Sequence, residues 1–156
     1  MSAVFYSKGW FRAKKKPLEL FSEERARALH EKGELYCALI GSTEKPNCFL
    51  EVTSSFVGVG FLDEELRENL SYSFQQKESG RLFLSMATWR EYEGSTDKVV
   101  NGTTYIFGTN GTLSIRKETF TPEHILETST NTADVSGNWE KFPLFGNYGC
   151  FTRAER

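Results

Sequence analysis

The feature that most constrains the fold is a series of short apolar segments from Glu34 to Ser129, each ended by turn-forming residues. Apolar and polar residues alternate within these segments with the period of two that is typical of β-strands. The clearest pair, TTYIF and TLSIRKETF, flanks Asn110-Gly111, a dipeptide suited to the two positive φ angles of a type I′ turn. A chain with this pattern is predicted to fold as consecutive antiparallel strands.

Two of these segments predict more than a single strand. CFLEVTSSFVGVGFLD predicts two strands or one long bent strand, in which Gly58 and Gly60 leave one face bare for a crossing chain or a sharp bend. RLFLSMATWREYE is apolar on both sides near its start, which is typical of an interior strand. Strict alternation in it predicts two opposite faces, formed by Leu82, Leu84, Met86 and by Phe83, Ala87, Trp89.

One stretch near the N-terminus has the signals of a helix. Ser22 can act as the N-cap, Glu23 and Glu24 follow it in the first turn, and Gly33 can end the helix. The helix has about ten residues and a narrow apolar stripe, so it is expected to lie across a sheet or to seal one end of it.

The stretch DVSGNWEKFPLFGNYGCF, residues 134–151, combines five aromatic residues and three glycines without a helical or strand period. Irregular segments are normally polar, because unpaired backbone groups face water. We therefore expect this tail to fold back across one end of the sheet as a lid. Packing against the core is favoured over direct contact with a partner.

The length and composition agree with one β-rich domain covering residues 1–156. A chain of 156 residues can bury a single core, and an aromatic content of 14% suits pleated sheet. The predicted class is mainly β (α+β). The expected architecture is a single curled antiparallel sheet, a sandwich or an open barrel of seven to nine strands with one short N-terminal helix.

Charge, cysteines and hydropathy limit the function classes. The net charge of −2 does not favour binding to a phosphate backbone, and the basic residues Arg12, Lys14, Lys15 and Lys16 are expected to form a solvated connector. The start lacks the apolar stretch of a signal peptide and no segment is apolar enough to span a membrane, so we expect a cytoplasmic protein. Three cysteines without zinc spacing predict neither disulfides nor a metal site, and no cofactor is expected.

Few residues are suited to catalysis. His30 and His124 are the two histidines, and neither has a catalytic partner nearby in the sequence. The glycines near Gly58 lack phosphate-loop spacing. We therefore expect a protein that works by presenting a binding surface rather than an enzyme.

Three segments in the second half of the chain carry a resemblance. GRLFLSMATWREYEG, TTYIFGTNGTLSIRK and DVSGNWEKFPLFGNYG resemble small immunity proteins of bacterial polymorphic toxin systems, including contact-dependent growth inhibition and Rhs systems. The resemblance implies a cytoplasmic antidote that binds one cognate toxin, one-to-one, commonly by covering a nuclease active site.

A nuclease toxin must be basic where it holds phosphates, so acidic side chains of an inhibitor would steer the two proteins together. Aromatic anchors would supply most of the affinity. The first candidate partner-binding set is Trp89, Glu91, Tyr92, Glu93 and Asp97. The second set is Glu118, Glu123 and Glu127.

Two alternatives remain open. A β-barrel would bind an apolar small ligand if Phe56, Phe61, Phe74 and Phe83 lined a cavity instead of filling it. A small hydrolase built around His124 is the weaker alternative, because no arrangement of acids, bases and nucleophiles is recognisable around it.

Overall fold

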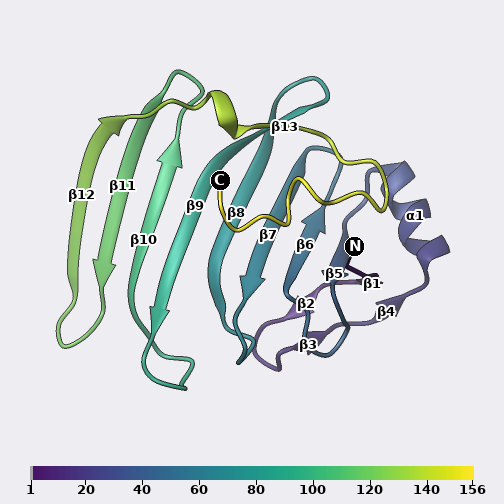
Figure 1. The fold of residues 1–156 in the computed structure, drawn as a ribbon, viewed down its shortest axis with the longest axis horizontal. Helices are drawn as coiled ribbons and strands as arrows, with labels where there is room; N and C mark the ends of the chain where they lie inside the picture. The colour runs from purple at the N-terminus through teal and green to yellow at the C-terminus, as the bar shows by residue number, and fades with distance from the viewer. Residues whose placement is uncertain (1) are drawn as a thin grey trace.

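The computed structural model describes residues 2–156, which form one large antiparallel sheet, one α-helix and a separate N-terminal hairpin of the paired strands β2 and β3 (Figure 1). The helix α1 spans Glu23–Lys32, and a 3₁₀ turn spans Ser136–Asn138. The strands are β1 Val4–Ser7, β2 Trp10–Phe11, β3 Lys16–Pro17, β4 Leu20–Phe21, β5 Tyr36–Ile40, β6 Cys48–Val52, β7 Phe56–Leu62, β8 Glu68–Glu78, β9 Arg81–Tyr92, β10 Val99–Phe107, β11 Thr112–Thr119, β12 Ile125–Thr132 and β13 Trp139–Lys141.

The large sheet has the order β12-β11-β10-β9-β8-β7-β6-β5-β1-β4, and β13 pairs with the start of β9. From β5 to β12 every strand pairs with its neighbour in sequence, so the prediction of consecutive antiparallel strands is confirmed. The sheet stays open and does not close into a barrel. Among residues 2–156 there are thirteen strands instead of the expected seven to nine, because strands of two to four residues carry no periodic signal.

The helix forms where the sequence predicts it. The Ser22 side chain accepts a hydrogen bond from the Arg25 amide (3.1 Å), and Gly33 ends the helix with a φ of 70°. Ala26 is its buried residue and packs into the main core at the β1/β5 end of the sheet. The helix therefore seals one end of the sheet, as its narrow apolar stripe predicts.

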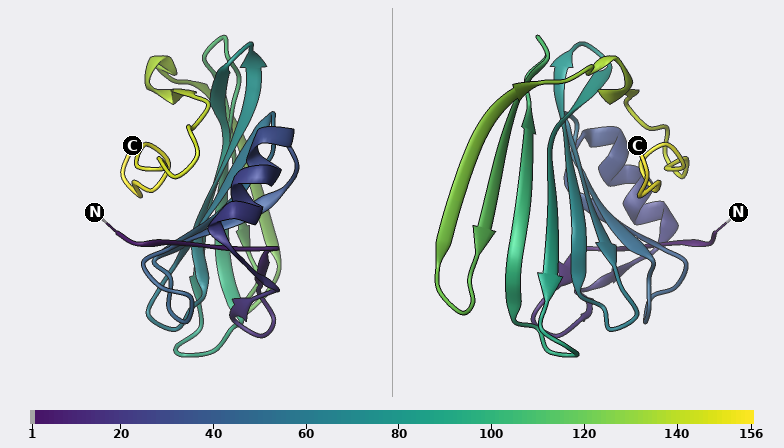
Figure 2. Two further views of the ribbon diagram at one scale, coloured as in Figure 1. Left: turned by 90° about the vertical axis from the view of Figure 1, so that its right-hand side faces the viewer. Right: turned by 60° about the vertical axis from the view of Figure 1, so that its left-hand side comes forward.

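The two faces of the sheet are covered by different parts of the chain. The face covered by residues 142–156 is called the tail side, and the opposite face, which carries β2 and β3, is called the hairpin side (Figure 2, left). On the hairpin side, the ring of Phe49 lies over Gly60, where a Cβ atom would collide with it. Trp10 of β2 stacks on Phe49 with centroids 6.1 Å apart. The bare face predicted at the glycines is thus filled by a ring and crossed by the N-terminal chain.

A β-bulge in β9 overturns the strict alternation expected there. Ser73 of β8 faces Met86, whereas Phe74 faces Leu84, so Ser85 is an extra residue without a partner. Its hydroxyl donates to the Ser73 carbonyl (3.3 Å). The bulge moves Met86 to the hairpin side and brings Trp89 onto the tail side, the face of Leu84.

One cross-strand row shows where the core ends. It runs on the tail side through directly paired residues, one per strand: Tyr6, Ala38, Leu50, Val59, Tyr72, Ala87, Tyr105, Ile115 and Ser129. The first six are buried, Tyr105 and Ile115 are half-buried, and Ser129 is exposed. Burial therefore ends at β9, and β10, β11 and β12, here called the wing, extend beyond the covered part of the sheet (Figure 2, right).

The prediction that the aromatic tail is a lid is confirmed. Tyr148 and Phe151 are buried in the main core, and Phe142 and Phe145 pack against it. The Phe151 ring meets Phe74 of β8 edge-on at 5.0 Å, and Phe145 stacks on Tyr6 of β1 at 5.0 Å. The remaining aromatic residue of the tail, Trp139, is not part of the lid: it lies in β13 and packs on Phe83, its direct partner in β9, on the hairpin side. The tail thus closes the core between the helix and β8.

The hairpin predicted at Asn110-Gly111 is present, but the predicted type I′ turn is wrong. Gly111 has a positive φ of 91°, whereas Asn110 does not. The Gly111 amide donates to the Gly108 carbonyl (3.0 Å), and the Asn110 side chain accepts from the Thr112 amide (3.1 Å). Asn110 thus serves as a side-chain acceptor, a second reason for asparagine in turns.

Truncation of a tail aromatic should measure how much the lid stabilises the fold. Phe151→Ala is expected to lower the free energy of unfolding by about 3–5 kcal/mol, because a fully buried ring leaves a cavity. Leu144→Ala, at a side chain of the same tail that is 75% exposed, is expected to change it by less than about 0.5 kcal/mol. Urea unfolding of both variants tests this, and equal effects would contradict the lid.

A chain of polar side chains joins the helix, the sheet and the tail. His30 Nδ1 lies 2.8 Å from the Tyr36 hydroxyl, which lies 2.8 Å from the Tyr148 hydroxyl. Burial raises the pKa of Tyr36 to about 12 and also raises the pKa of Tyr148. Burial lowers the pKa of His30, and nearby Arg27 acts in the same direction while Glu31 opposes it. These hydroxyls and the neutral imidazole therefore hold the tail onto the helix end of the sheet.

The His30 contact predicts a pH dependence of stability. Because the pKa of His30 is lower in the folded than in the unfolded chain, the unfolded chain binds the proton more readily. The free energy of unfolding should therefore fall as the pH drops below about 6.5. His30→Gln should weaken this dependence. Urea unfolding at several pH values checks this, and identical slopes for His30→Gln and the natural chain would refute the assignment.

Candidate partner-binding surface

A hollow of about 700 Å³ lies on the tail side where the tail ends and the wing begins. Strands β8, β9 and β10 form its floor, and the segments around Asn138 and Arg156 form its wall. Its lining residues are Leu70, Tyr72, Leu84, Ala87, Trp89, Tyr105, Phe107, Asp134, Gly137, Asn138, Ala154 and Arg156. The lining is mostly apolar and contains four aromatic side chains.

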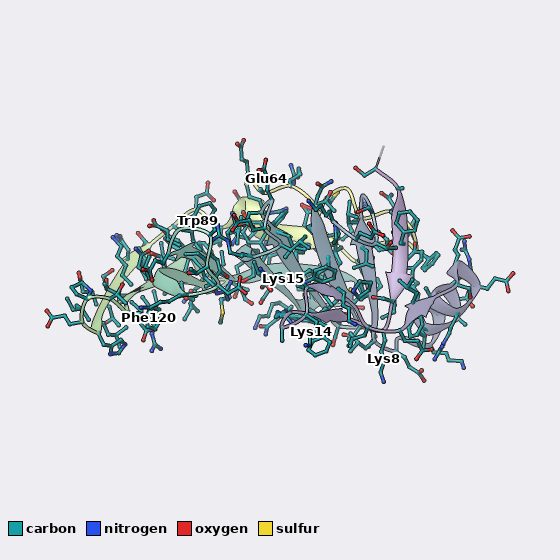
Figure 3. All side chains as sticks on the ribbon, turned by 90° about the horizontal axis from the view of Figure 1, so that it is seen from below. Lys8, Lys14, Lys15, Glu64, Trp89 and Phe120 are labelled. Atoms are coloured by element: carbon teal, nitrogen blue, oxygen red, sulfur yellow. The ribbon has the colours of Figure 1, made fainter. Side chains whose placement is uncertain are left out.

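Trp89 is the most informative side chain of this hollow. Its side of β9 is set by the Ser85 bulge, and 45% of its surface is exposed. Figure 3 shows Trp89 on the side of the sheet where the tail lies, with Phe120 and Lys14 on the opposite side. A tryptophan left this exposed beside half-buried Tyr105 and Phe107 is typical of a binding surface.

The wall of the hollow is held by the last residues of the chain. Arg156 donates to Glu140 (3.0 Å) and to the Cys150 carbonyl (2.8 Å), and its guanidinium carbon lies 4.9 Å from the centroid of Phe74. The Tyr72 hydroxyl donates to the Ala154 carbonyl (2.5 Å). The cation is therefore neutralised by Glu140, and the wall is a positioned part of the fold.

Asp134 and Asn138 complete the hollow at the 3₁₀ turn. The Asp134 carboxylate accepts from the Ser136 amide (3.0 Å), and this bond lowers the pKa of Asp134. The Asn138 amide donates to the Leu84 carbonyl beside the Ser85 bulge (2.9 Å). The turn is therefore tied to β9 at the point that orients Trp89.

The structure divides the first predicted set between the two faces. Trp89 and Glu91 lie on the tail side, where Glu91 accepts from Asn101 (3.2 Å). Tyr92 lies on the hairpin side, where its hydroxyl donates a hydrogen bond to the Glu68 carbonyl (2.8 Å). Asp97 lies on the same side and forms an ion pair with Lys15 (2.7 Å). Glu93 lies in the following turn, 3.6 Å from Lys98. The set does not form one surface.

The second predicted set is divided in the same way. Glu118 lies on the hairpin side and pairs with His124 (2.5 Å), while Glu127 faces Lys117 on the tail side of the wing. Glu123 lies exposed in the turn before β12. Trp89, Glu91 and Glu127 are therefore the predicted residues that share the tail side.

A second groove, of about 480 Å³, lies on the hairpin side between residues 10–15, the 63–67 turn, the start of β8 and the end of β9. Its charged groups are paired with each other: Arg12 with Glu68 (2.9 Å) and Glu51 (3.2 Å), and Arg67 with Asp63 (2.9 Å). Within residues 2–156, the two non-glycine residues with positive φ, Lys15 and Leu66, both border it. We read this groove as the attachment of the N-terminal hairpin to the sheet.

Metal binding and acid–base catalysis find little support in the positions of the described side chains. Among residues 2–156, no group of three or more His, Cys, Asp or Glu side chains is placed to hold a metal ion. His124 contacts the ring of Phe120 and the carboxylate of Glu118 at the exposed end of β11. His124 and Glu118 combine an imidazole and a carboxylate, but neither residue lines the 700 Å³ hollow or the 480 Å³ groove.

Sequence reasoning missed most of the hollow. Tyr105 and Phe107 are two positions apart in β10, so the period of two predicts that they lie on the same face. Nothing in the sequence signals that Ala154 and Arg156 reach β8, because their positions depend on the fold of an irregular tail.

Comparisons of the chain with protein-family models, curated proteins and solved structures found no match. In the described part of the chain, no helix has the length and apolar character needed to cross a membrane.

The hairpin-side network makes a prediction about stability. Glu68 and Glu51 both pair with Arg12, but the Glu68 side chain is 15% exposed and that of Glu51 is 37% exposed. Glu68→Gln is expected to lower the free energy of unfolding by about 1–2 kcal/mol, and Glu51→Gln by less than about 1 kcal/mol. High salt should reduce the stability loss of Glu51→Gln more than that of Glu68→Gln, because the Glu51 side chain is the more exposed of the two. Urea unfolding at two salt concentrations measures both, and a larger loss for Glu51→Gln would contradict this account.

Proposed function

We propose that this protein is an immunity protein that binds a cognate cytotoxic toxin domain through its tail side and blocks it. The observation that carries the proposal is the exposed Trp89 in an apolar hollow that opens onto the uncovered wing. The resemblance of three segments to immunity proteins supports a toxin as the partner. The exposure of Trp89 supports the tail side as the binding surface.

The chemistry of the hollow favours a protein partner. Interface energy concentrates in a few aromatic and arginine side chains in partly enclosed positions, and the hollow contains Trp89, Tyr105 and Arg156. Leu113 and Ile115 of β11 continue the half-buried apolar surface across the wing. A side chain of the partner would insert into the hollow, and its neighbours would lie along β10 and β11.

Charge on the same face agrees with a basic partner. Glu91 and Glu127 are exposed on the tail side, and the carboxylate of Asp134 borders the hollow. Lys117 is the opposing charge beside Glu127. The three carboxylates would accelerate the encounter with a basic toxin domain, whereas the aromatic side chains would hold it.

A small apolar ligand is the second candidate, because the hollow has the size of a ligand site and an apolar floor. The four phenylalanines of the barrel alternative, Phe56, Phe61, Phe74 and Phe83, do not line this hollow. Phe74 is buried against Phe151 and Phe83 against Trp139, while Phe61 meets Tyr72 edge-on. A ligand would therefore occupy the Trp89 hollow. Mass spectrometry of the protein purified under native conditions would detect it.

The partner is tested by coexpressing the tagged protein with the product of the neighbouring upstream gene. A one-to-one complex whose partner alone stops growth is the expected result. In that complex, Trp89→Ala should weaken binding about 30-fold or more, the effect of losing an aromatic hot spot worth about 2 kcal/mol. The melting temperature should change little, because Trp89 is half exposed. Isothermal titration calorimetry measures the affinity.

Ile106→Ala is the matched control for this prediction. Ile106 is 43% exposed, a value close to that of Trp89, and it lies on the hairpin side of the neighbouring strand. Its truncation should leave the affinity unchanged. Loss of binding in Ile106→Ala but not in Trp89→Ala would move the interface to the hairpin side.

A further inference from the structure

Strand β12 forms an unusually open edge of the large sheet. All eight of its residues are exposed and pair with β11 in an unbroken register. Natural edge strands are commonly protected by lysine, proline, a bulge or short length, and β12 has none of these. The strand at the other edge, β4, has two residues. The two edges are therefore not equivalent.

The ladder with β11 shows which backbone groups of β12 point outward. The Ala133 amide donates to the Gly111 carbonyl (2.9 Å), which marks this residue pair as hydrogen-bonded. Hydrogen-bonded and non-hydrogen-bonded pairs alternate in antiparallel sheets, so the N–H and C=O groups of Leu126, Thr128 and Thr130 point away from β11. The Thr132 amide, next in the same series, is capped by the Asn131 side chain (3.0 Å).

From this edge we propose that β12 pairs antiparallel with β12 of a second copy of the chain, with Thr128 on the two-fold axis. Thr128 then faces Thr128 of the second copy, and Leu126 faces Thr130. All outward N–H and C=O groups of these three residues are satisfied by six hydrogen bonds, two for each of the three residue pairs. The proposal concerns the protein alone and does not depend on the toxin.

Charge and symmetry favour a second copy as the occupant. Glu127 is the single charged residue of β12, and in this register it faces Ser129 of the second copy, so like charges are not opposed. A two-fold axis normal to the sheet keeps the tail sides of both copies on one face. Because β4 is too short to continue the ladder, association stops at two copies and does not propagate into a fibre.

The extent of the contact predicts a weak dimer. One strand pair buries much less surface than the interface of about 1,600 Å² that is usual for stable complexes. The dimer should therefore form and dissociate with protein concentration. Sedimentation velocity over a concentration series should show a monomer–dimer equilibrium, and amide hydrogen exchange at Leu126, Thr128 and Thr130 should slow as the concentration rises.

Two variants of Thr128 separate backbone pairing from side-chain contact. Thr128→Pro removes an outward N–H without removing a bond to β11, and it should abolish the dimer while the circular dichroism spectrum is retained. Thr128→Ala keeps the N–H and should retain the dimer. A dimer that persists in Thr128→Pro, or a chain that is monomeric at all concentrations, would overturn the proposal.

A cross-link tests the register. In a Cys150→Ser background, Thr128→Cys places two thiols across the axis on Cα atoms about 5.5 Å apart, within disulfide range. Thr130→Cys is the control, because its two copies would lie on the order of 13 Å apart, four residues along the strand. Oxidation should yield a covalent dimer for Thr128→Cys and not for Thr130→Cys. Equal cross-linking would refute this register. Protection of the three amides that appears only when a toxin is added would assign the edge to the toxin instead.

Discussion

The structure depends on a mismatch between the length of the antiparallel ladder and the extent of its cover. The ladder from β5 to β12 is continuous, so every strand adds two faces that must be buried or solvated. The tail and helix cover the tail side from β1 to β9, and the hairpin covers part of the opposite side. On the tail side full burial ends at β9, and on the hairpin side the apolar cluster under Trp10 extends only from β5 to β7. The wing is stable as sheet because it is hydrogen-bonded to β9, and it is exposed because no further segment reaches it.

This mismatch explains the change in composition along the chain. Strands under the tail, such as β5 and β6, are almost wholly apolar, whereas β12 is rich in threonine, serine and asparagine. Residues of this kind retain the extended backbone while they face water on both sides. Tyr105 and Phe107 of β10 still pack against the margin of the main core. Leu113 and Ile115 of β11 lie beyond that core, so they are the apolar residues of the wing that folding alone does not explain.

Much of the fold could be predicted from the sequence because its signals are local. Period-two alternation located β5 to β12, and the cap at Ser22 with the stop at Gly33 located the helix. The aromatic residues of the tail predicted a lid, since rings of that size are buried where a core is available. Asn110-Gly111 predicts the hairpin correctly but the wrong turn type, because asparagine stabilises turns by two different mechanisms.

The candidate site could be predicted much less well, and the reason is the bulge at Ser85. A single extra residue exchanges the faces of every later side chain in β9, so strict alternation separates Trp89 from Leu84 although they share a face. The proximity in sequence of Trp89, Glu91, Tyr92 and Asp97 then suggests one surface where the sheet creates two. The hollow needs, in addition, the C-terminal contacts of Arg156, which no local pattern encodes.

The tail links the stability of the fold to the shape of the hollow. Phe151 is buried in the core, and Arg156, five residues later, forms the wall of the hollow. At the start of the tail, the Asn138 side chain donates a hydrogen bond to the Leu84 carbonyl. Displacement of the tail would uncover Tyr72 and Leu84 and would widen the hollow at the same time. A partner that inserts a side chain beside Trp89 therefore meets a wall whose position is fixed by core packing. The same contacts that close the core thus determine which side chain fits the hollow.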